Sequence, residues 1–233
     1  PLYSSAASDV YKRQALDPVR YLGNRSSGRQ GIAIAQAAAD LGASVDLIVA
    51  HLEVEAPEPT ERLRVHRVSS ALELESSVHA SVLGEDSADA VVMTAAVADF
   101  RPKSMATTKI KKDPDADDAP SIELVRNPDI LKGLVESRRR GEHSAFLVGF
   151  AAETGSPEHS VAELGEAKFR SKGSDMLVVN EVGSELVFGR DETAATILVA
   201  TNDGIASESV SGPKAVLARR LMTRVASHLN IGS

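Results

Sequence analysis

The stretch LRVHRVSSALELESSVHASVLGEDSADAVVMT, residues 63–94, decides the fold. Its opening run, Leu63–Val68, predicts a short strand, and its closing run, Asp89–Thr94, predicts a buried strand with a Val-Val-Met centre. Between these strands, Ser70-x-x-Glu73 has the capping-box pattern that opens a helix, and Gly84 is expected to end that helix. A strand, a helix and a second strand in this order predict a parallel β-α-β unit.

The same alternation continues on both sides of this stretch. We therefore expect an α/β fold of three layers, Rossmann-like, with a mostly parallel sheet and an antiparallel hairpin at one edge. Ligands of such sheets bind beyond the carboxyl ends of the strands, which directs attention to the loops after Thr94, Phe150 and Val179. Further strands are expected at Ala43–Ala50, Ile122–Val125, Ala145–Phe150, Asp175–Val179, Ala194–Ala200 and Ile205–Val210, and further helices at Arg29–Leu41, Asn127–Arg140, Ser156–Gly173 and Pro213–Asn230.

Composition narrows the classes of function. The 233 residues suit one α/β domain, and no apolar run approaches the roughly 18–20 residues that a membrane span needs. The absence of cysteine excludes disulfides, thiolate nucleophiles and Cys-bound zinc, and we expect a cytoplasmic protein. A net charge of −7 disfavours a nucleic-acid partner. A local group of lysines instead favours a small anionic ligand.

A glycine- and serine-containing segment, Gly23–Gly31, precedes the first expected helix. Free N–H groups at a helix N-terminus, together with the hydroxyls of Ser26 and Ser27, can bind phosphate. The segment has the first spacing of a P-loop but lacks its Lys-Ser/Thr, and it lacks G-x-G-x-x-G, which disfavours a dinucleotide site. A helix start with glycines for close packing is the alternative interpretation.

Three more groups of residues are candidates for binding. Ala95–Asp99 follows a predicted strand, and its small side chains leave room for a substrate. Asp99 either binds a ribose hydroxyl or a metal, or it is a solvated residue in a turn. Lysines at 109, 111 and 112 lie in the long loop Ala98–Pro120, where they either close over a polyphosphate or form a solvated charge run. Lys168 and Lys172 share one face of a predicted helix and either bind phosphate or lie on the surface.

Taken together, these motifs resemble the phosphopantothenoylcysteine synthetase family, the synthetase domain of the bacterial bifunctional coenzyme A biosynthesis protein. The resemblance covers the chain from Leu16 onward, and its specificity comes from the order of the motifs. They are Leu16–Arg20 (LDPVR), Asn24–Gly28 (NRSSG), Ala95–Asp99 (AAVAD), Lys109–Lys112 (KIKK), Asn127–Ile130 (NPDI) and Val148–Thr154 (VGFAAET), followed by Lys168 and Lys172.

The resemblance implies a ligase that joins 4′-phosphopantothenate to L-cysteine. The pantothenate carboxylate would attack the α-phosphate of CTP, releasing pyrophosphate and forming an acyl-cytidylate, and the cysteine amine would then release CMP. Magnesium would accompany the triphosphate, and no flavin is expected in this domain. A flavin-dependent decarboxylase, as a domain or a subunit, is an expected partner. The choice of CTP over ATP rests on the bacterial relatives.

Residue roles also follow from the resemblance alone. It implies that Asn24 and Lys109 are catalytic, and that Asn24, Ala95 and Ala96 bind the substrate. The family is dimeric, so Lys109 is expected to reach the partner's site on its loop, and the metal ligands stay unassigned. The nucleotide-binding set is Ser26, Ser27, Gly28, Met93, Thr94, Ala95, Asp99, Lys109, Pro128, Asp129, Ile130, Leu131, Phe150, Lys168 and Lys172.

The first fourteen residues depart from the family pattern, because they replace an expected hydrophobic strand and glycine-rich turn with a glycine-free Ser- and Ala-rich run. We expect residues 1–14 to be non-native or mis-assigned, residues 15–233 to form the ligase domain, and a central strand to be missing. Two other functions stay open: an NAD(P)-dependent oxidoreductase and a non-catalytic nucleotide-binding module.

Overall fold

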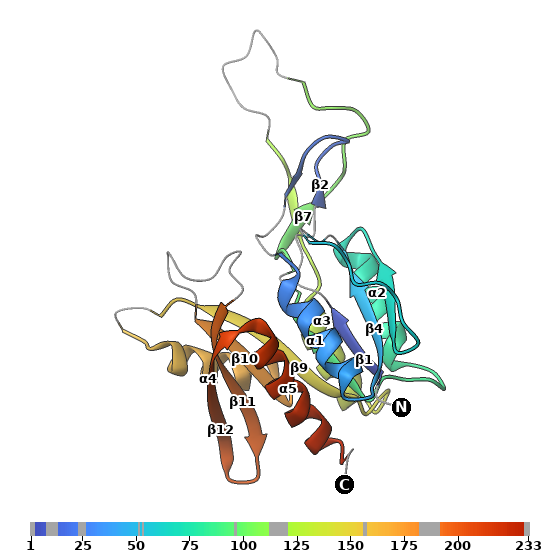
Figure 1. Ribbon diagram of the computed structural model, residues 1–233. Helices are drawn as coiled ribbons and strands as arrows, with labels where there is room; N and C mark the ends of the chain where they lie inside the picture. The colour runs from blue at the N-terminus through green and yellow to red at the C-terminus, as the bar shows by residue number, and fades with distance from the viewer. Residues whose placement is uncertain are drawn as a thin grey trace.

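The computed structural model describes residues 3–7, 14–22, 27–50, 52, 54–95, 97–111, 121–155, 158–181 and 192–230. The main sheet has eight strands in the order β12-β11-β10-β9-β6-β1-β4-β5 (Figure 1). These strands are β1 (Tyr3–Ala7), β4 (Ser44–Val49), β5 (Leu63–Arg67), β6 (Ala90–Met93), β9 (Phe146–Glu153), β10 (Met176–Glu181), β11 (Glu192–Thr201) and β12 (Gly204–Pro213).

The strand order identifies the sheet as a doubly wound one. The neighbouring strands from β5 to β10 all pair in parallel, and numbered along the chain their order in the sheet is 3-2-1-4-5-6. This is the Rossmann order, with its switch point between β1 and β6. Strands β11 and β12 add an antiparallel hairpin at the edge, joined through Asn202 and Asp203. The predicted fold class is therefore confirmed.

One expectation about the amino terminus is wrong. The sheet does not lack a central strand, because Tyr3–Ala7 forms β1 between β4 and β6. The run Tyr-Ser-Ser-Ala-Ala has no Val, Ile or Leu, so its composition gave no signal for a strand. The expectation that residues 1–14 are non-native or mis-assigned stays a prediction.

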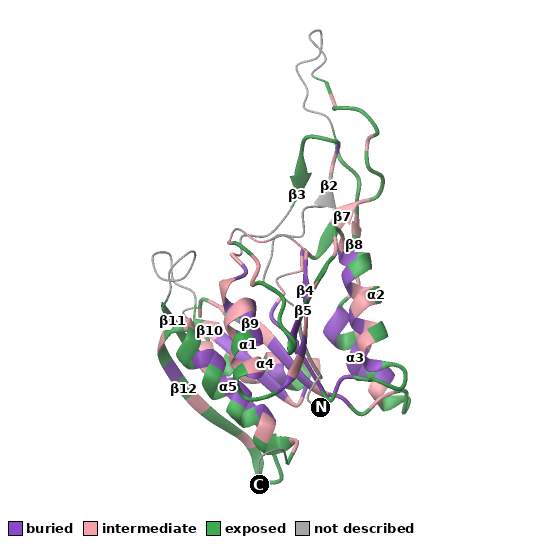
Figure 2. Cartoon of the chain, turned by 45° about the vertical axis from the view of Figure 1, so that its right-hand side comes forward, coloured by how far each residue is buried: buried purple, intermediate pink, exposed green. Residues whose placement is uncertain are grey.

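Helices cover both faces of the sheet and create two main cores. On one face, α1 (Arg29–Asp40) packs against α5 (Lys214–His228) over residues such as Leu47, Val92 and Val178. On the other face lie α2 (Ala71–Val82), α3 (Ile130–Arg139) and α4 (Val161–Lys172). Figure 2 shows the buried residues concentrated in this layered body. Successive strand residues point to opposite faces, which is why Val91 and Val92 belong to different cores.

A slender arm projects from the body beyond the carboxyl edge of the sheet (Figures 1 and 2). It contains the antiparallel pair β2 (Gln14–Ala15) and β3 (Tyr21–Leu22), and the antiparallel pair β7 (Phe100–Pro102) and β8 (Leu124–Arg126). Strand β7 corrects the expectation that Ala98–Pro120 holds no strand. Its three residues form a strand because they pair with β8. The arm also carries the predicted lysine loop.

Two predicted helix starts are displaced. Helix α3 begins at Ile130, and its cap is Asp129, whose carboxylate accepts a hydrogen bond from Lys132 N at 3.2 Å. The predicted cap, Asn127, instead donates to Ala98 O at 2.7 Å. Helix α4 begins at Val161, where Ser160 and Glu163 form the reciprocal capping box. In each case a second capping residue further along the chain was available.

Candidate active site

A pocket of about 520 Å³ lies beyond the carboxyl ends of β6, β9 and β10. Its walls come from these strand ends, from the turn after β6, from the start of α3 and from one face of α4. This position, beside the switch point of the sheet, is where doubly wound folds bind their ligands. The lining residues are Met93, Thr94, Ala95, Val97, Ala98, Asp99, Asn127, Pro128, Asp129, Ile130, Leu131, Phe150, Ala151, Ala152, Lys168, Lys172, Leu177 and Asn180.

Most of the predicted nucleotide-binding residues meet in this pocket. They come from four separate motifs that span eighty positions of the chain, so their convergence is not a consequence of sequence proximity. The residues brought together are Met93, Thr94, Ala95, Asp99, Pro128, Asp129, Ile130, Leu131, Phe150, Lys168 and Lys172. That they bind a nucleotide stays a prediction.

The two lysines of the pocket are paired with carboxylates. Lys168 Nζ lies 2.7 Å from Glu153 Oε1, at the end of β9, and Lys172 Nζ lies 2.5 Å from Asp129 Oδ2, at the start of α3. The lysine side chains keep 40% and 30% of their surface exposed. Both ammonium groups are therefore partly open to solvent, and both are already held by an anion.

Sequence reasoning missed several lining residues. Asn127 was interpreted as a helix cap, and its hydrogen bonds with Ala98 O and, through its backbone N–H, with Asp99 O join the turn after β6 to the start of α3. Asn180 lies in β10, and Thr193 Oγ1 donates to its Oδ1 at 3.4 Å. The sequence did contain a signal for Asn180, because this residue directly follows the predicted strand Asp175–Val179, where ligands are expected to bind.

Other predicted residues lie outside the pocket lining. Ser27 and Gly28 immediately precede α1, and Gly28 has a φ of 82° at the N-cap position. Since α1 follows β1 in a parallel crossover, its N-terminus lies at the same edge of the sheet as the pocket. Asn24, Ser26 and Ala96 fall outside the described residues, so the structure does not place them.

Lys109 is exposed on the arm and does not line the pocket. Its neighbour Ile110 is anchored to the LDPVR motif: Ile110 N donates to Asp17 Oδ2 at 3.1 Å, and Arg20 Nη2 donates to Ile110 O at 2.5 Å. The Asp17 carboxylate also accepts from Val19 N and Arg20 N, both at 2.8 Å. Burial alone would raise the pKa of Asp17, but these hydrogen bonds outweigh it and hold the pKa well below its ordinary value.

Comparison with known proteins decides the family. The profile described as "DNA/pantothenate metabolism flavoprotein C-terminal domain" matches residues 12–229. The chain belongs to this family. Within it, the chain is 43% identical over 221 residues to the "Coenzyme A biosynthesis bifunctional protein CoaBC" of Mycobacterium bovis. That alignment covers 93% of the chain but 50% of the relative, so the chain spans about half the length of this family member.

Two solved structures agree with this chain in fold. The crystal structure of the C-terminal domain of a CoaBC protein aligns with a TM-score of 0.70 and 30% identity, covering 98% of this chain and 95% of that one. A Cab2 mutant in complex with phosphopantothenate-cysteine aligns with a TM-score of 0.65, covering 98% and 88%, and at 15% identity it supports the fold alone. The eight-stranded sheet and its helices thus have the Rossmann-like fold of the CoaBC C-terminal domain.

Two features are absent from the described residues. No helix among them is long and apolar enough to cross a membrane. Nor does this part of the chain group three or more His, Asp or Glu side chains as a metal site of their own.

Proposed function

We propose that this chain is a phosphopantothenate–cysteine ligase that uses CTP and acts in the cytoplasm in coenzyme A biosynthesis. The observation that carries the proposal is the convergence of the predicted nucleotide residues in one pocket of a family member. The likeness to bifunctional coenzyme A biosynthesis proteins supports it, and so does the family fold of a protein solved with phosphopantothenate-cysteine.

The pocket suits a reaction that needs positioning and charge neutralisation more than covalent catalysis. Phe150 and the start of α3 provide a partly apolar wall for the base, and Lys168 and Lys172 provide cations for the triphosphate. The first turn of α1, after Ser27 and Gly28, provides N–H groups for phosphate oxygens. Asn24 is assigned to the acyl-cytidylate, because its amide donates hydrogen bonds without adding negative charge to an electron-rich intermediate.

The donors of this pocket fit magnesium if a bound triphosphate supplies the remaining oxygen ligands. The ion usually takes one or two carboxylates and several phosphate oxygens rather than an all-protein cage. Asp99 is an exposed carboxylate in the pocket lining and is the residue that suits this ion. When bound, magnesium supplies neutralisation of the triphosphate charge.

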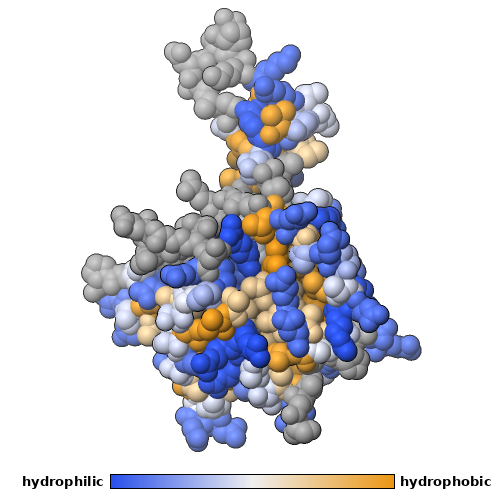
Figure 3. All heavy atoms as spheres, viewed as in Figure 1, coloured by the Kyte–Doolittle hydropathy of each residue, from blue (hydrophilic) through white to orange (hydrophobic). Residues whose placement is uncertain are grey.

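The proposed assembly is a homodimer formed through the arm. Seven of the eleven large hydrophobic residues exposed in the described part of the chain lie on it: Val19, Tyr21, Leu22, Phe100, Met105, Ile122 and Leu124. Hydrophobic surface is visible along the arm in Figure 3. Such a concentration marks an interaction surface, and a second copy would also explain how Lys109, which does not line its own pocket, meets substrate. A flavin-dependent decarboxylase, as in the bifunctional relatives, is a further proposed partner.

The test measures pyrophosphate release. We expect release only when CTP, magnesium and 4′-phosphopantothenate are all present, with about one equivalent per site when cysteine is withheld. Lys168→Gln is expected to raise the KM for CTP by about 10- to 150-fold, since a charge-assisted hydrogen bond contributes about 1.5–3 kcal/mol. Lys132→Gln removes an equally positive side chain from the exposed face of α3 and serves as the matched control.

Two results would contradict the ligase. One is the absence of pyrophosphate above background from folded protein. The other is tight binding of NADPH without binding of CTP, which would favour an oxidoreductase. Stabilisation by CTP in a thermal melt without product would favour the non-catalytic binding module.

A further inference from the structure

Each lysine of the pocket is neutralised by a carboxylate from a different element. Helix α4 presents Lys168 and Lys172 one turn apart, and Glu153 and Asp129 hold them from the end of β9 and the start of α3. The same arrangement therefore occurs twice in one pocket. A polyphosphate that uses these lysines therefore meets two ammonium groups that each already donate to a carboxylate.

The charges of the described lining residues cancel. Asp99 and Asp129 carry two negative charges, and Lys168 and Lys172 carry two positive ones. Glu153 does not line the pocket but adds a negative charge directly behind Lys168. A triphosphate thus meets lysines whose field is offset by nearby anions, which lowers its affinity. Replacing the carboxylate by a phosphate at a lysine costs little free energy, since partly exposed ion pairs contribute at most about 1 kcal/mol.

The two carboxylates are not equivalent. Asp129 also caps α3, where it accepts a hydrogen bond from Lys132 N. Its negative charge therefore has a structural use at a helix N-terminus. The Glu153 side chain is 18% exposed, and among the described residues its carboxylate pairs with Lys168. Removing its charge leaves the helix caps untouched.

We propose that Glu153 sets the affinity of the pocket for polyphosphate. In the free protein its carboxylate holds Lys168, and a phosphate of the ligand displaces it on binding. This inference rests on the proposed function only in identifying the ligand as a nucleoside triphosphate. It makes Glu153 a residue that weakens ground-state binding, which favours turnover by keeping the nucleotide and the released pyrophosphate from binding too tightly.

The test is calorimetric titration of Glu153→Gln with CTP and with inorganic tripolyphosphate, each in EDTA. Glutamine keeps the length of the side chain and can still accept from Lys168, so the fold is expected to persist. We expect both ligands to bind about three- to tenfold more tightly than to the unsubstituted protein. Glu166→Gln is the matched control, because Glu166 lies on the same helix but pairs with Arg170 at 3.1 Å. It is expected to change affinity less than about twofold.

Three outcomes are decisive. Unchanged or weaker binding of tripolyphosphate to Glu153→Gln in EDTA would overturn the proposal. So would CTP binding that is weakened by the substitution only when magnesium is present, because Glu153 would then be a metal ligand. If the unsubstituted protein does not bind CTP, but Glu153→Gln binds tripolyphosphate more tightly than the unsubstituted protein does, the proposed function fails and the inference stands.

Discussion

At the residue scale, Gly149 shows how a missing side chain shapes the pocket. It lies in the middle of β9, directly before Phe150, and the chain passes close to two leucines there. A Cβ at this position would lie 2.6 Å from Leu131 Cδ2 and 3.0 Å from Leu177 Cδ1. Both leucines line the pocket and are buried. The absence of a side chain at Gly149 therefore lets α3 and β10 close around the site.

We predict that Gly149→Ala destabilises the protein by about 1–3 kcal/mol, the usual cost of overpacking. Alanine recovers only about 0.5–1 kcal/mol of backbone entropy in a strand, so the clash is the larger effect. Urea unfolding measures the change. The same substitution in a Leu131→Ala background is expected to cost less, because the clashing methyl group is gone. Equal costs in both backgrounds would argue against this contact.

The charge and helical spacing of single residues were the easiest properties to predict at this scale. Lys168 and Lys172 reach the pocket because the i,i+4 spacing puts them on one helix face. Their partners Glu153 and Asp129 could not be paired with them from sequence, since 15 and 43 positions separate the residues of the two pairs. Only packing of β9, α3 and α4 sets those distances.

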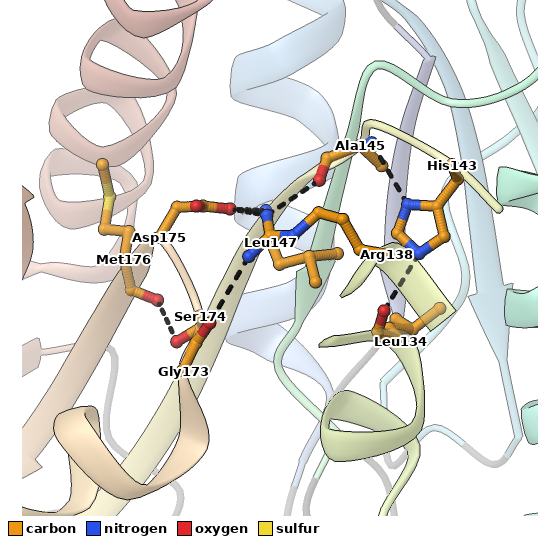
Figure 4. Close-up of polar contacts among 9 residues, drawn as sticks. All are labelled: Leu134, Arg138, His143, Ala145, Leu147, Gly173, Ser174, Asp175 and Met176. Carbon is orange, nitrogen blue, oxygen red and sulfur yellow. Dashed lines mark hydrogen bonds and ion pairs between the residues drawn. The ribbon is translucent and has the colours of Figure 1, made fainter. Parts of the chain in front are cut away.

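At the scale of elements, a polar network at the far end of β9 holds the strands and helices that carry the pocket (Figure 4). Arg138, near the end of α3, pairs with Asp175, and Asp175 Oδ2 accepts from Leu147 N at 2.7 Å. His143 Nε2 is 3.0 Å from Leu134 O, and its Nδ1 accepts from Ala145 N at 3.2 Å. The network thus joins α3 to the starts of β9 and β10.

The geometry of His143 predicts a pH dependence. Its Nδ1 is an acceptor, so the neutral ring fits the folded protein. Burial lowers the pKa of His143 most, Arg138 and His79 lower it further, and the contacts with Leu134 and Glu142 oppose the change. Because the folded pKa lies below the unfolded value near 6.5, the unfolded chain binds more protons as the pH falls. This part of the stability is complete above pH 6.5 and declines below it.

We therefore predict that the free energy of unfolding falls between about pH 7 and pH 5, and that His143→Gln flattens this fall. Urea titrations at several pH values measure both slopes. Equal slopes for the two proteins would show that groups other than His143 cause the pH dependence of stability. A rise in stability toward pH 5 would contradict the predicted direction of the change.

At the scale of the whole molecule, the arm and the body have different tasks. The body contains the cores and the pocket. The arm exposes apolar side chains (Figure 3), and it carries Lys109 beside Ile110, which donates to Asp17. The buried Asp17 carboxylate joins the segment before Lys111 to the hairpin of β2 and β3. Positioning of Lys109 is thus linked to the surface proposed for the second copy.

We predict that the protein sediments as a dimer and that Leu124→Asp shifts it toward the monomer. Leu124 is 44% exposed on the arm, and a charge there would be buried without a partner in the interface. Leu83→Asp is the matched control, since Leu83 is 46% exposed on the body beside α2. A monomeric unsubstituted protein, or a dimer that tolerates Leu124→Asp, would contradict the proposed assembly.

The sequence by itself determined the layered α/β fold and the edge hairpin, and its resemblance to the synthetase family implied the eleven residues that line one pocket. Periodicity and helix signals act locally, and parallel strands bring their carboxyl ends together wherever they fall in the chain. Only the tertiary structure decided that Tyr3–Ala7 is the central strand, that Asp129 rather than Asn127 caps α3, and that Glu153 neutralises Lys168. Each of these depends on partners distant in sequence or on competition between neighbouring groups, which no local pattern encodes.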